Sequence, residues 1–148
     1  IVQGGLVGKL TKWLGMNKVI QLGFILWTVG MTLFSFASEG WMLYLYLIPY
    51  AIGGIASPTL QSLLSNSVPE EEQGNLQGSI TGLLSITAIV GPYIATKLFS
   101  KYADKAAEIY FPGAPFLFAA ILLILSTLIV FFALRSHKRA SNLETLTD

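Results

Sequence analysis

The sequence predicts an all-α, polytopic membrane protein, and two observations carry that prediction. First, 53% of the 148 residues are hydrophobic and only 11% are charged, whereas a soluble domain carries about 25% charged residues. Second, the charged residues divide the chain into four uncharged intervals, each long enough for a helix of about 20 residues to cross the hydrocarbon core. A soluble helical core is nearly excluded, because so few charged side chains cannot cover a water-exposed surface.

The four uncharged intervals give the expected spans in chain order, and they contain 20, 30, 24 and 26 residues. Membrane strands are a poor alternative, because they would alternate in polarity and residues 117–125 (LFAAILLIL) do not. Residues 1–8 are also uncharged and are expected to end a preceding span. We therefore expect transmembrane helices throughout residues 1–135, with spans at about 19–38, 41–65, 74–97 and 111–134, and a cytoplasmic tail over 136–148.

The basic residues predict the orientation of these spans. If the spans alternate in direction, six Lys and Arg residues share one side of the membrane and three share the other. The positive-inside rule places the richer side in the cytoplasm, so residues 9–18, residues 69–73 and the C-terminus are expected there. The six are Lys9, Lys12, Lys18, Arg135, Lys138 and Arg139, and the three are Lys97, Lys101 and Lys105.

Proline and glycine interrupt the second span, which contains Pro49, Gly53, Gly54 and Pro58. Each proline removes an internal hydrogen bond and bends its helix, so kinks are expected at Pro49 and Pro58, and at Pro92 in the third span. Broken helices recur at transporter binding sites. Two interpretations stay open for the second span, namely a gating or substrate-lining helix and a static kink that serves packing.

The third span opens with Gly74, Gly78 and Gly82, a doubled small-xxx-small pattern. This pattern removes side chains from one stripe of a helix and predicts close packing on another backbone; a sliding surface for conformational change is the alternative. The segment before it, residues 67–70 (SVPE), has the composition of a helix start, with Ser67 as the expected cap.

Few polar side chains lie inside the expected spans. Gln61 is the largest neutral one, and its amide suits an interhelical hydrogen bond or, as the less favoured alternative, a polar ligand. Ser85 and Thr87 carry hydroxyls in the third span, which could simply bond back to their own helix. No carboxylate lies well inside a span, so the intramembrane acids that a proton-coupled protein uses are expected outside this chain.

The sequence contains no motif for catalysis, metal binding or cofactor binding. There is no cysteine, no His/Asp/Glu cluster with metal spacing, no phosphate loop and no nucleophile elbow. The net charge of +1 indicates no nucleic-acid partner. We therefore expect no enzymatic activity, no metal and no cofactor.

Several runs of residues resemble one family. Residues 53–65 (GGIASPTLQSLLS) and 68–78 (VPEEEQGNLQG) resemble the tenth and eleventh helices of the tetracycline/proton antiporters, a drug-efflux branch of the major facilitator superfamily. Residues 89–92 (IVGP) match a further element of that pattern, and residues 5–10 (GLVGKL) resemble the loop between its eighth and ninth helices. One departure is clear, because Glu72 stands where the family usually has arginine.

The resemblance implies the C-terminal part of a twelve-helix facilitator, from the end of helix eight through helices nine to twelve. It further implies export of a tetracycline-like drug in exchange for protons by alternating access, in the bacterial inner membrane. The implied partners are the drug, protons, the lipid bilayer and the N-terminal helices of the same transporter. Helices ten and eleven would face the cavity. The candidates for cavity or gating roles are Pro58, Gln61, Ser85 and Thr87, and those for helix packing are Gly74, Gly78 and Gly82.

Two alternatives remain for the function. The first is another facilitator with a different small-molecule substrate. The second is a non-transporting helix-bundle subunit, which explains the hydropathy and the glycine stripe equally well. It does not explain why Pro58, the repeated Gln-Gly pair and the Gly91-Pro92 pair occur together in that order.

Overall fold

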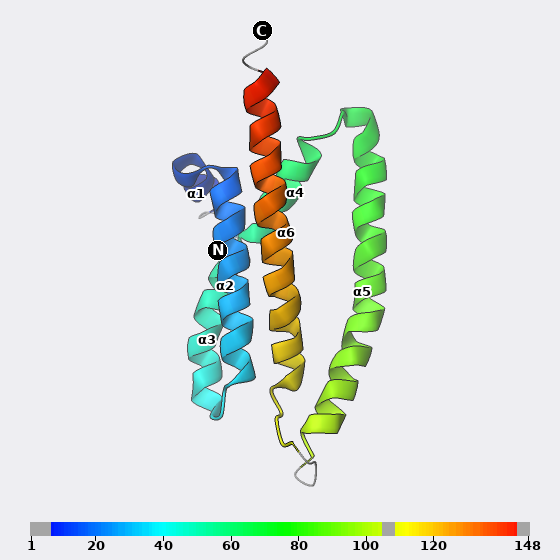
Figure 1. The fold of residues 1–148 in the computed structure, drawn as a ribbon. Helices are drawn as coiled ribbons and strands as arrows, with labels where there is room; N and C mark the ends of the chain where they lie inside the picture. Colours follow the sequence, from blue (N-terminus) through cyan, green and yellow to red (C-terminus); the bar gives the residue numbers. More distant parts are fainter. Residues whose placement is uncertain (1–6, 105–108, 145–148) are drawn as a thin grey trace.

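The computed structural model of the protein describes residues 7–104 and 109–144, with side chains from residue 8 to residue 136 of these ranges, and its regular structure is helical throughout (Figure 1). This confirms the predicted all-α fold class. The elements are α1 (Val7–Leu14), α2 (Met16–Ser35), α3 (Gly40–Gly53), α4 (Ala56–Ser65), the 3-10 helix η2 (Glu70–Glu72), α5 (Gln73–Tyr102) and α6 (Ala114–Glu144).

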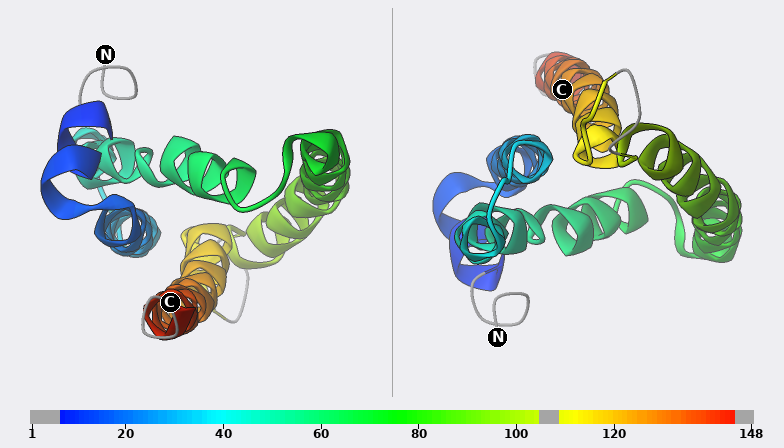
Figure 2. Two further views of the ribbon diagram at one scale, coloured as in Figure 1. Left: turned by 90° about the horizontal axis from the view of Figure 1, so that it is seen from above. Right: turned by 90° about the horizontal axis from the view of Figure 1, so that it is seen from below.

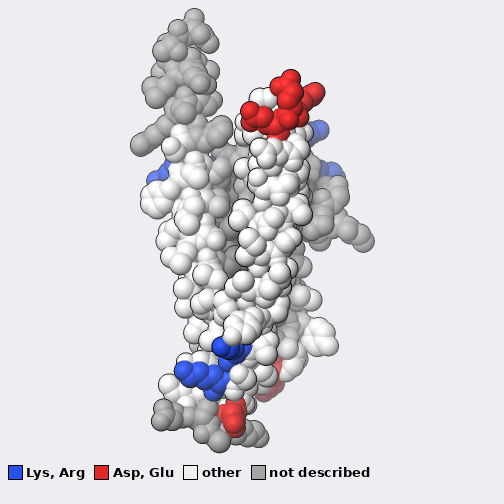
Figure 3. All heavy atoms as spheres, turned by 90° about the vertical axis from the view of Figure 1, so that its right-hand side faces the viewer, with Lys and Arg blue, Asp and Glu red and all other residues white. Residues whose placement is uncertain are grey.

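Four stretches of the described chain are long and apolar enough to cross a membrane, as the charge intervals predicted. Figure 3 shows Lys, Arg, Asp and Glu side chains gathered at the two ends of the molecule, with a broad uncharged band between them. This band has the character of a surface that meets hydrocarbon. The four stretches are Met16–Ser35, Gly40–Ser65, Glu70–Tyr102 and Ala114–Ser136.

Helix α2 lies at the centre of the packed part of the molecule and contacts α3, α4 and α6. Val19 and Ile20 of α2 are fully buried, and Ala120 of α6 is 1% exposed. A Cβ atom on Gly30 of α2 would lie 2.9 Å from the Cβ atom of Tyr50 in α3. Close approach of this kind increases van der Waals contact, which is the main attraction between helices in lipid.

The second membrane stretch is a broken helix. Helix α3 ends at Gly53 and α4 begins at Ala56, with turn residues between them. Pro58 has no N–H to donate to the carbonyl of Gly54, four residues earlier, so the interruption falls where that bond is missing. Pro49 lies inside α3, which continues on both sides of it.

Helix boundaries differ from the expected span boundaries at both ends of the chain. Residues 9–18, which lie before the first expected span, are mostly helical, because α1 runs to Leu14 and α2 begins at Met16. The helices are separated at Gly15, which has a φ of +82°, a conformation that glycine adopts without strain. Helix α6 continues past Arg135 to Glu144. Charges mark where a helix leaves the apolar layer, whereas backbone bonding decides where it ends.

The start of the third stretch also differs from the prediction. Ser67 donates its hydroxyl to the carbonyl of Leu63 at 2.7 Å, so it bonds back to the end of α4 and does not cap the following helix. Helix η2, formed by the three glutamates, comes next, and α5 begins at Gln73 without a side-chain cap.

Helix α5 stands apart from the packed part. None of its 30 residues is buried, and its main contacts are with α6 and η2. Seen from above, α4 leads away from α2 and α3 toward the start of α5 (Figure 2). Helix α5 runs through Pro92 as one continuous element.

Candidate functional site

The break between α3 and α4 is anchored on α2. Ile55 and Ala56, which lie at the break, are 1% and 0% exposed. Gly23 of α2 faces them, and a Cβ atom there would lie 2.6 Å from the Cβ atom of Ala56 and 2.9 Å from the carbonyl oxygen of Gly53. Glycine at this position therefore lets the two backbones approach, which fixes one side of the broken helix.

Local hydrogen bonds satisfy several backbone groups at the break. The N–H groups of Gly54 and Ile55 donate to the carbonyls of Ala51 and Ile52, each at 3.2 Å. The buried Thr59 donates its hydroxyl to the carbonyl of Ile55 at 2.7 Å. Interrupted helices persist in membranes only where such groups find partners. The break is thus a stable part of this fold, built by protein groups on α2, α3 and α4.

A group of polar side chains joins α4 to α5. Gln61 donates from Nε2 to Oε1 of Gln77 at 3.2 Å, and Gln77 donates from Nε2 to Oγ of Ser65 at 3.4 Å. A longer contact of 3.5 Å runs from Nε2 of Gln73 to the carbonyl oxygen of Ser65. These four residues, Gln61, Ser65, Gln73 and Gln77, form what we call the glutamine bridge.

Gln61 was expected to form either an interhelical hydrogen bond or a contact with a polar ligand. The structure shows the interhelical hydrogen bond, although the Gln61 side chain is also exposed. The sequence indicated Gln61 alone, and its partners Ser65, Gln73 and Gln77 were not predicted. The available signal was the four-residue spacing of Gln73 and Gln77, which places both amides on one side of a helix.

Thr87 lines an apolar pocket of about 360 Å³ between α5 and α6. Val90 and Ile94 of α5 and Phe118 and Leu122 of α6 are among its other lining residues. The Thr87 hydroxyl donates to the carbonyl of Leu84 at 2.9 Å. The pocket wall is therefore almost wholly hydrophobic, and it suits an apolar group better than a polar one.

Ser85 lies on a different side of α5. Its spacing from Gly78 and Gly82 places it on their side of the helix, whereas Thr87 lies two residues further on. The Ser85 hydroxyl donates to the carbonyl of Thr81 at 2.9 Å. We call the surface formed by Gly74, Gly78, Gly82 and Ser85 the glycine face.

The glycine face is open in this structure. A Cβ atom on Gly74, Gly78 or Gly82 would meet nothing within 4 Å. The structure therefore does not bring the sequence-derived candidates into one cluster. Pro58 is half-buried near the break, Gln61 belongs to the glutamine bridge, Thr87 faces α6, and Ser85 lies on the glycine face.

Among the described residues, the Lys, Arg, Asp and Glu side chains lie near the ends of the membrane stretches or outside them. Glu70, Glu71 and Glu72 are exposed on η2. Within residues 7–104 and 109–144, no group of three His, Cys, Asp or Glu side chains is placed to hold a metal ion. What the described part offers is a membrane-embedded helix break, an amide bridge and two contrasting faces of α5.

Comparison with known proteins identifies the family. The model of the Major Facilitator Superfamily matches residues 4–147, so the chain belongs to this superfamily of multi-pass membrane transporters, which are not enzymes. No solved structure matches the chain at a significant level.

Several curated relatives carry tetracycline resistance in their names. The chain is 39% identical to the class C tetracycline resistance protein of Escherichia coli over 70% of its own length and 26% of that protein. It is 31% identical to the class H protein of Pasteurella multocida, over 88% of the chain and 31% of that protein. Hippocampus abundant transcript-like protein 1 of Mus musculus is 25% identical over 89% of the chain and 29% of its own length. The chain thus spans about a quarter to a third of these relatives.

Proposed function

We propose that the chain is the C-terminal portion of a secondary transporter that exports a tetracycline-like drug in exchange for protons. The observation that carries this proposal is the 36–39% identity to tetracycline resistance proteins of classes C, G, E and D. The broken helix supports it, because discontinuous helices are a common device at the substrate sites of secondary transporters.

The mechanism proposed is alternating access, in which two halves of the transporter rock about a site near the middle of the membrane. The part of α3 and α4 next to the break is held on α2 through Gly23 and Ala56. The far end of α4 meets α5 through the glutamine bridge. Pro58 lies between these two attachments and Gln61 belongs to the second, so this part of α4 is placed to act as a gating or cavity-lining segment that follows a movement of α5 relative to α2.

The glycine face of α5 is proposed to pack on the N-terminal helices of the same transporter. Large apolar side chains on several sides of α5 are exposed, including Leu83 at 66% and Ile89 at 76%. The glycine stripe is the one surface of α5 where another backbone could approach closely. Ser85 would then lie at this contact, while Thr87 would stay against α6.

The proposed location is the bacterial inner membrane, with the C-terminus in the cytoplasm. The tetracycline resistance relatives come from bacteria such as Escherichia coli and Pasteurella multocida. Helix α1, the start of α2, η2 and the end of α6 lie at one end of the molecule (Figure 1). This end carries the larger group of basic residues, which favours a cytoplasmic placement.

A drug-accumulation assay tests this proposal. Cells that express the full-length gene should hold less tetracycline than cells with an empty vector. Collapsing the proton gradient with an uncoupler should abolish the difference, because export against a concentration gradient needs that energy. Equal drug accumulation in both cell types would contradict the proposed substrate, and export that persists without the gradient would contradict the proposed coupling.

A second candidate is a facilitator with another small-molecule substrate. It is favoured by the similarity to Hippocampus abundant transcript-like protein 1, which covers more of the chain than the class C match does, although at lower identity. The same cells would then show normal tetracycline accumulation, and a transport screen with other small molecules would identify the cargo.

A further inference from the structure

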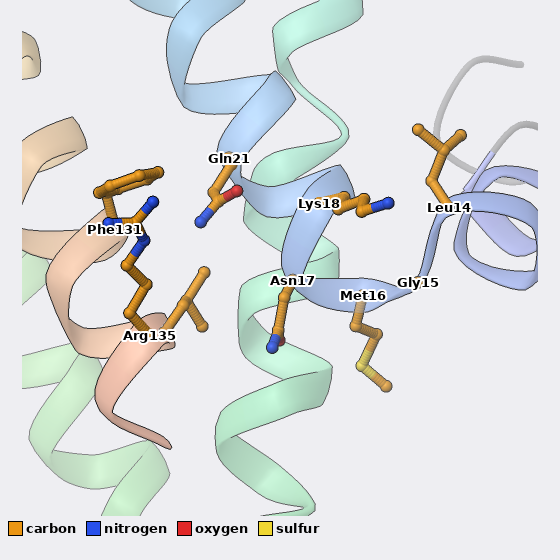
Figure 4. A pocket seen from close by; sticks show the side chains of 9 residues that line it. Leu14, Gly15, Met16, Asn17, Lys18, Gln21, Phe131 and Arg135 are labelled. Atoms are coloured by element: carbon orange, nitrogen blue, oxygen red, sulfur yellow. The ribbon is translucent and has the colours of Figure 1, made fainter. Parts of the chain in front are cut away.

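A second pocket lies away from the proposed transport site, where the beginning of α2 meets the end of α6. Its volume is about 620 Å³, and its lining includes Asn17, Lys18 and Gln21 of α2 and Phe131 and Arg135 of α6. Figure 4 shows Gln21 reaching toward Phe131 and Arg135, while Lys18 extends along the opposite flank toward Leu14. We call this the basic pocket.

The basic pocket has the chemistry of an anion site. Among the described residues, its lining contains two basic side chains, two amides and no acidic side chain. The guanidinium carbon of Arg135 lies 4.1 Å from the centre of the Phe131 ring, a cation–π contact that orients the group without neutralising its charge. An anionic oxygen cluster on the Arg135 side would therefore meet its guanidinium group and the Gln21 amide, while Lys18 adds positive charge from the opposite flank of the pocket (Figure 4).

The backbone of α2 adds donors to the same pocket. Helix α2 begins at Met16, and the residue before it, Gly15, makes no side-chain cap. The first N–H groups of a helix have no partner inside the helix, and together with the helix dipole they favour phosphate oxygens. The N–H of Gly15 already donates to the carbonyl of Thr11 at 3.0 Å, so the donors at this wall are those of Met16 and Asn17, which both line the pocket.

An apolar groove continues from the basic pocket along the same two helices. Ile25 and Val29 of α2 and Ile124 and Leu128 of α6 line a smaller hollow of about 160 Å³. Their exposed fractions lie between 43% and 50%. Helical spacing places Ile25 and Val29 below Gln21, and Leu128 and Ile124 below Arg135 and Phe131. The surface therefore changes from basic to apolar toward the middle of the membrane stretch.

We propose that an anionic phospholipid binds between α2 and α6, with its phosphate in the basic pocket and an acyl chain in the apolar groove. The order of the two subsites matches the order of the two parts of a lipid. A soluble phosphate would use only the first subsite, and a zwitterionic lipid would gain less from Lys18 and Arg135, because its ammonium group offsets the charge of its phosphate. Basic pockets between transmembrane helices on the cytoplasmic side are suited to acidic headgroups, and this is the side where we place these helix ends.

Native mass spectrometry of the full-length transporter tests the proposal, with phosphatidylglycerol and phosphatidylcholine offered in equal amounts. Retention of phosphatidylglycerol should exceed that of phosphatidylcholine. Arg135→Gln should weaken phosphatidylglycerol retention by about fivefold, and addition of Lys18→Gln by about thirtyfold in total, from about 1 kcal/mol per basic residue near an anionic surface. The matched control is Lys97→Gln with Lys101→Gln, which removes two charges at the opposite end and should leave retention unchanged.

A photoactivatable phosphatidylglycerol gives an independent measurement on the unmodified protein. Its cross-links should map to peptides that contain residues 17–29 and 124–135. Equal retention in the charge variants, or cross-links that map only elsewhere, would overturn the proposal. Displacement of the lipid by millimolar glycerol phosphate would also overturn it, because that result would show a site for a soluble phosphate and no use of the acyl groove.

Discussion

The packed part of the molecule, formed by α2, α3, α4 and α6, differs sharply from α5. In the packed part, glycines are contact points: a Cβ atom on Gly23, Gly30 or Gly53 would lie less than 3.0 Å from a neighbouring helix. In α5, a Cβ atom on any of the four glycines, at positions 74, 78, 82 and 91, would meet none of the described residues within 4 Å. Both regions contain glycines, yet among the described residues only the packed part sets them against a neighbouring helix of this chain.

This difference teaches what a small-residue pattern can and cannot indicate. Glycine on a membrane helix permits a close approach, but the pattern does not identify the partner. Gly23 and Gly30, spaced seven residues apart, pack against partners within the chain. The regular glycine stripe of α5 is the stronger pattern, and it faces a surface that we assign to helices outside this chain.

The largest expected effect is on Gly23, at the tightest contact of the packed part. In the full-length transporter, Gly23→Leu should prevent folding, because even a Cβ atom would lie 2.6 Å from Ala56. Overpacking of a well-filled interior typically costs about 1–3 kcal/mol, and a leucine against backbone atoms should exceed this. The measurement is the monodisperse fraction after detergent extraction. A yield equal to that of the unmodified protein would contradict the assigned contact.

A different result is expected for Gly78 on the open face. Gly78→Leu should leave membrane insertion and extraction yield intact, since none of the described residues lies within 4 Å of a Cβ atom placed there. It should abolish drug export, because the added side chain blocks the proposed contact with the N-terminal helices. Undiminished export by this variant would show that the glycine face has no close partner.

The glutamine bridge should make a smaller, measurable contribution. A double-mutant cycle with Gln61→Ala and Gln77→Ala should give a coupling energy of about 0.6 kcal/mol, the average for hydrogen bonds between membrane helices. Unfolding of the purified full-length transporter in mixed micelles provides the free energies. Additive effects would mean that the amide contact does not hold α4 and α5 together.

The smallest effect is expected between Thr28 of α2 and Thr127 of α6, whose hydroxyl oxygens lie 3.2 Å apart. Each hydroxyl already donates to a carbonyl of its own helix, of Phe24 and Leu123 respectively. Neither has a second proton to give to the other. A Thr→Val cycle should therefore show coupling below about 0.5 kcal/mol, within the usual limit of additivity. A larger value would mean that one of the backbone bonds is exchanged for the interhelical one.

The sequence was sufficient for the number and order of the membrane stretches, because charge is so costly in hydrocarbon that its absence marks each span. Proline was less decisive: it removes a specific hydrogen bond and led us to expect kinks at Pro49, Pro58 and Pro92, but α3 and α5 continue through Pro49 and Pro92. Helix ends were less predictable. Arg135 marks an expected span end, yet α6 continues, because arginine is a good helix former in water.

Contacts between helices could not be predicted from the sequence. The approach of Gly23 to Ala56 depends on the crossing geometry of α2 and α4, which no local pattern encodes. Gln61 was recognised as a polar residue with two possible roles, but Gln77 became its partner only when α5 was placed beside α4. The separation of Ser85 from Thr87 follows from simple helical spacing and could have been predicted.

The central claim is that the glycine face of α5 is a protein-facing surface completed by another part of the transporter. Photo-cross-linking of the full-length protein tests this directly, with a photoreactive amino acid at position 85 and, as the matched control, at position 87. The probe at position 87 should cross-link to α6. The probe at position 85 should cross-link to a peptide outside the 148 residues described by this sequence. Cross-links from position 85 to lipid alone would contradict the claim.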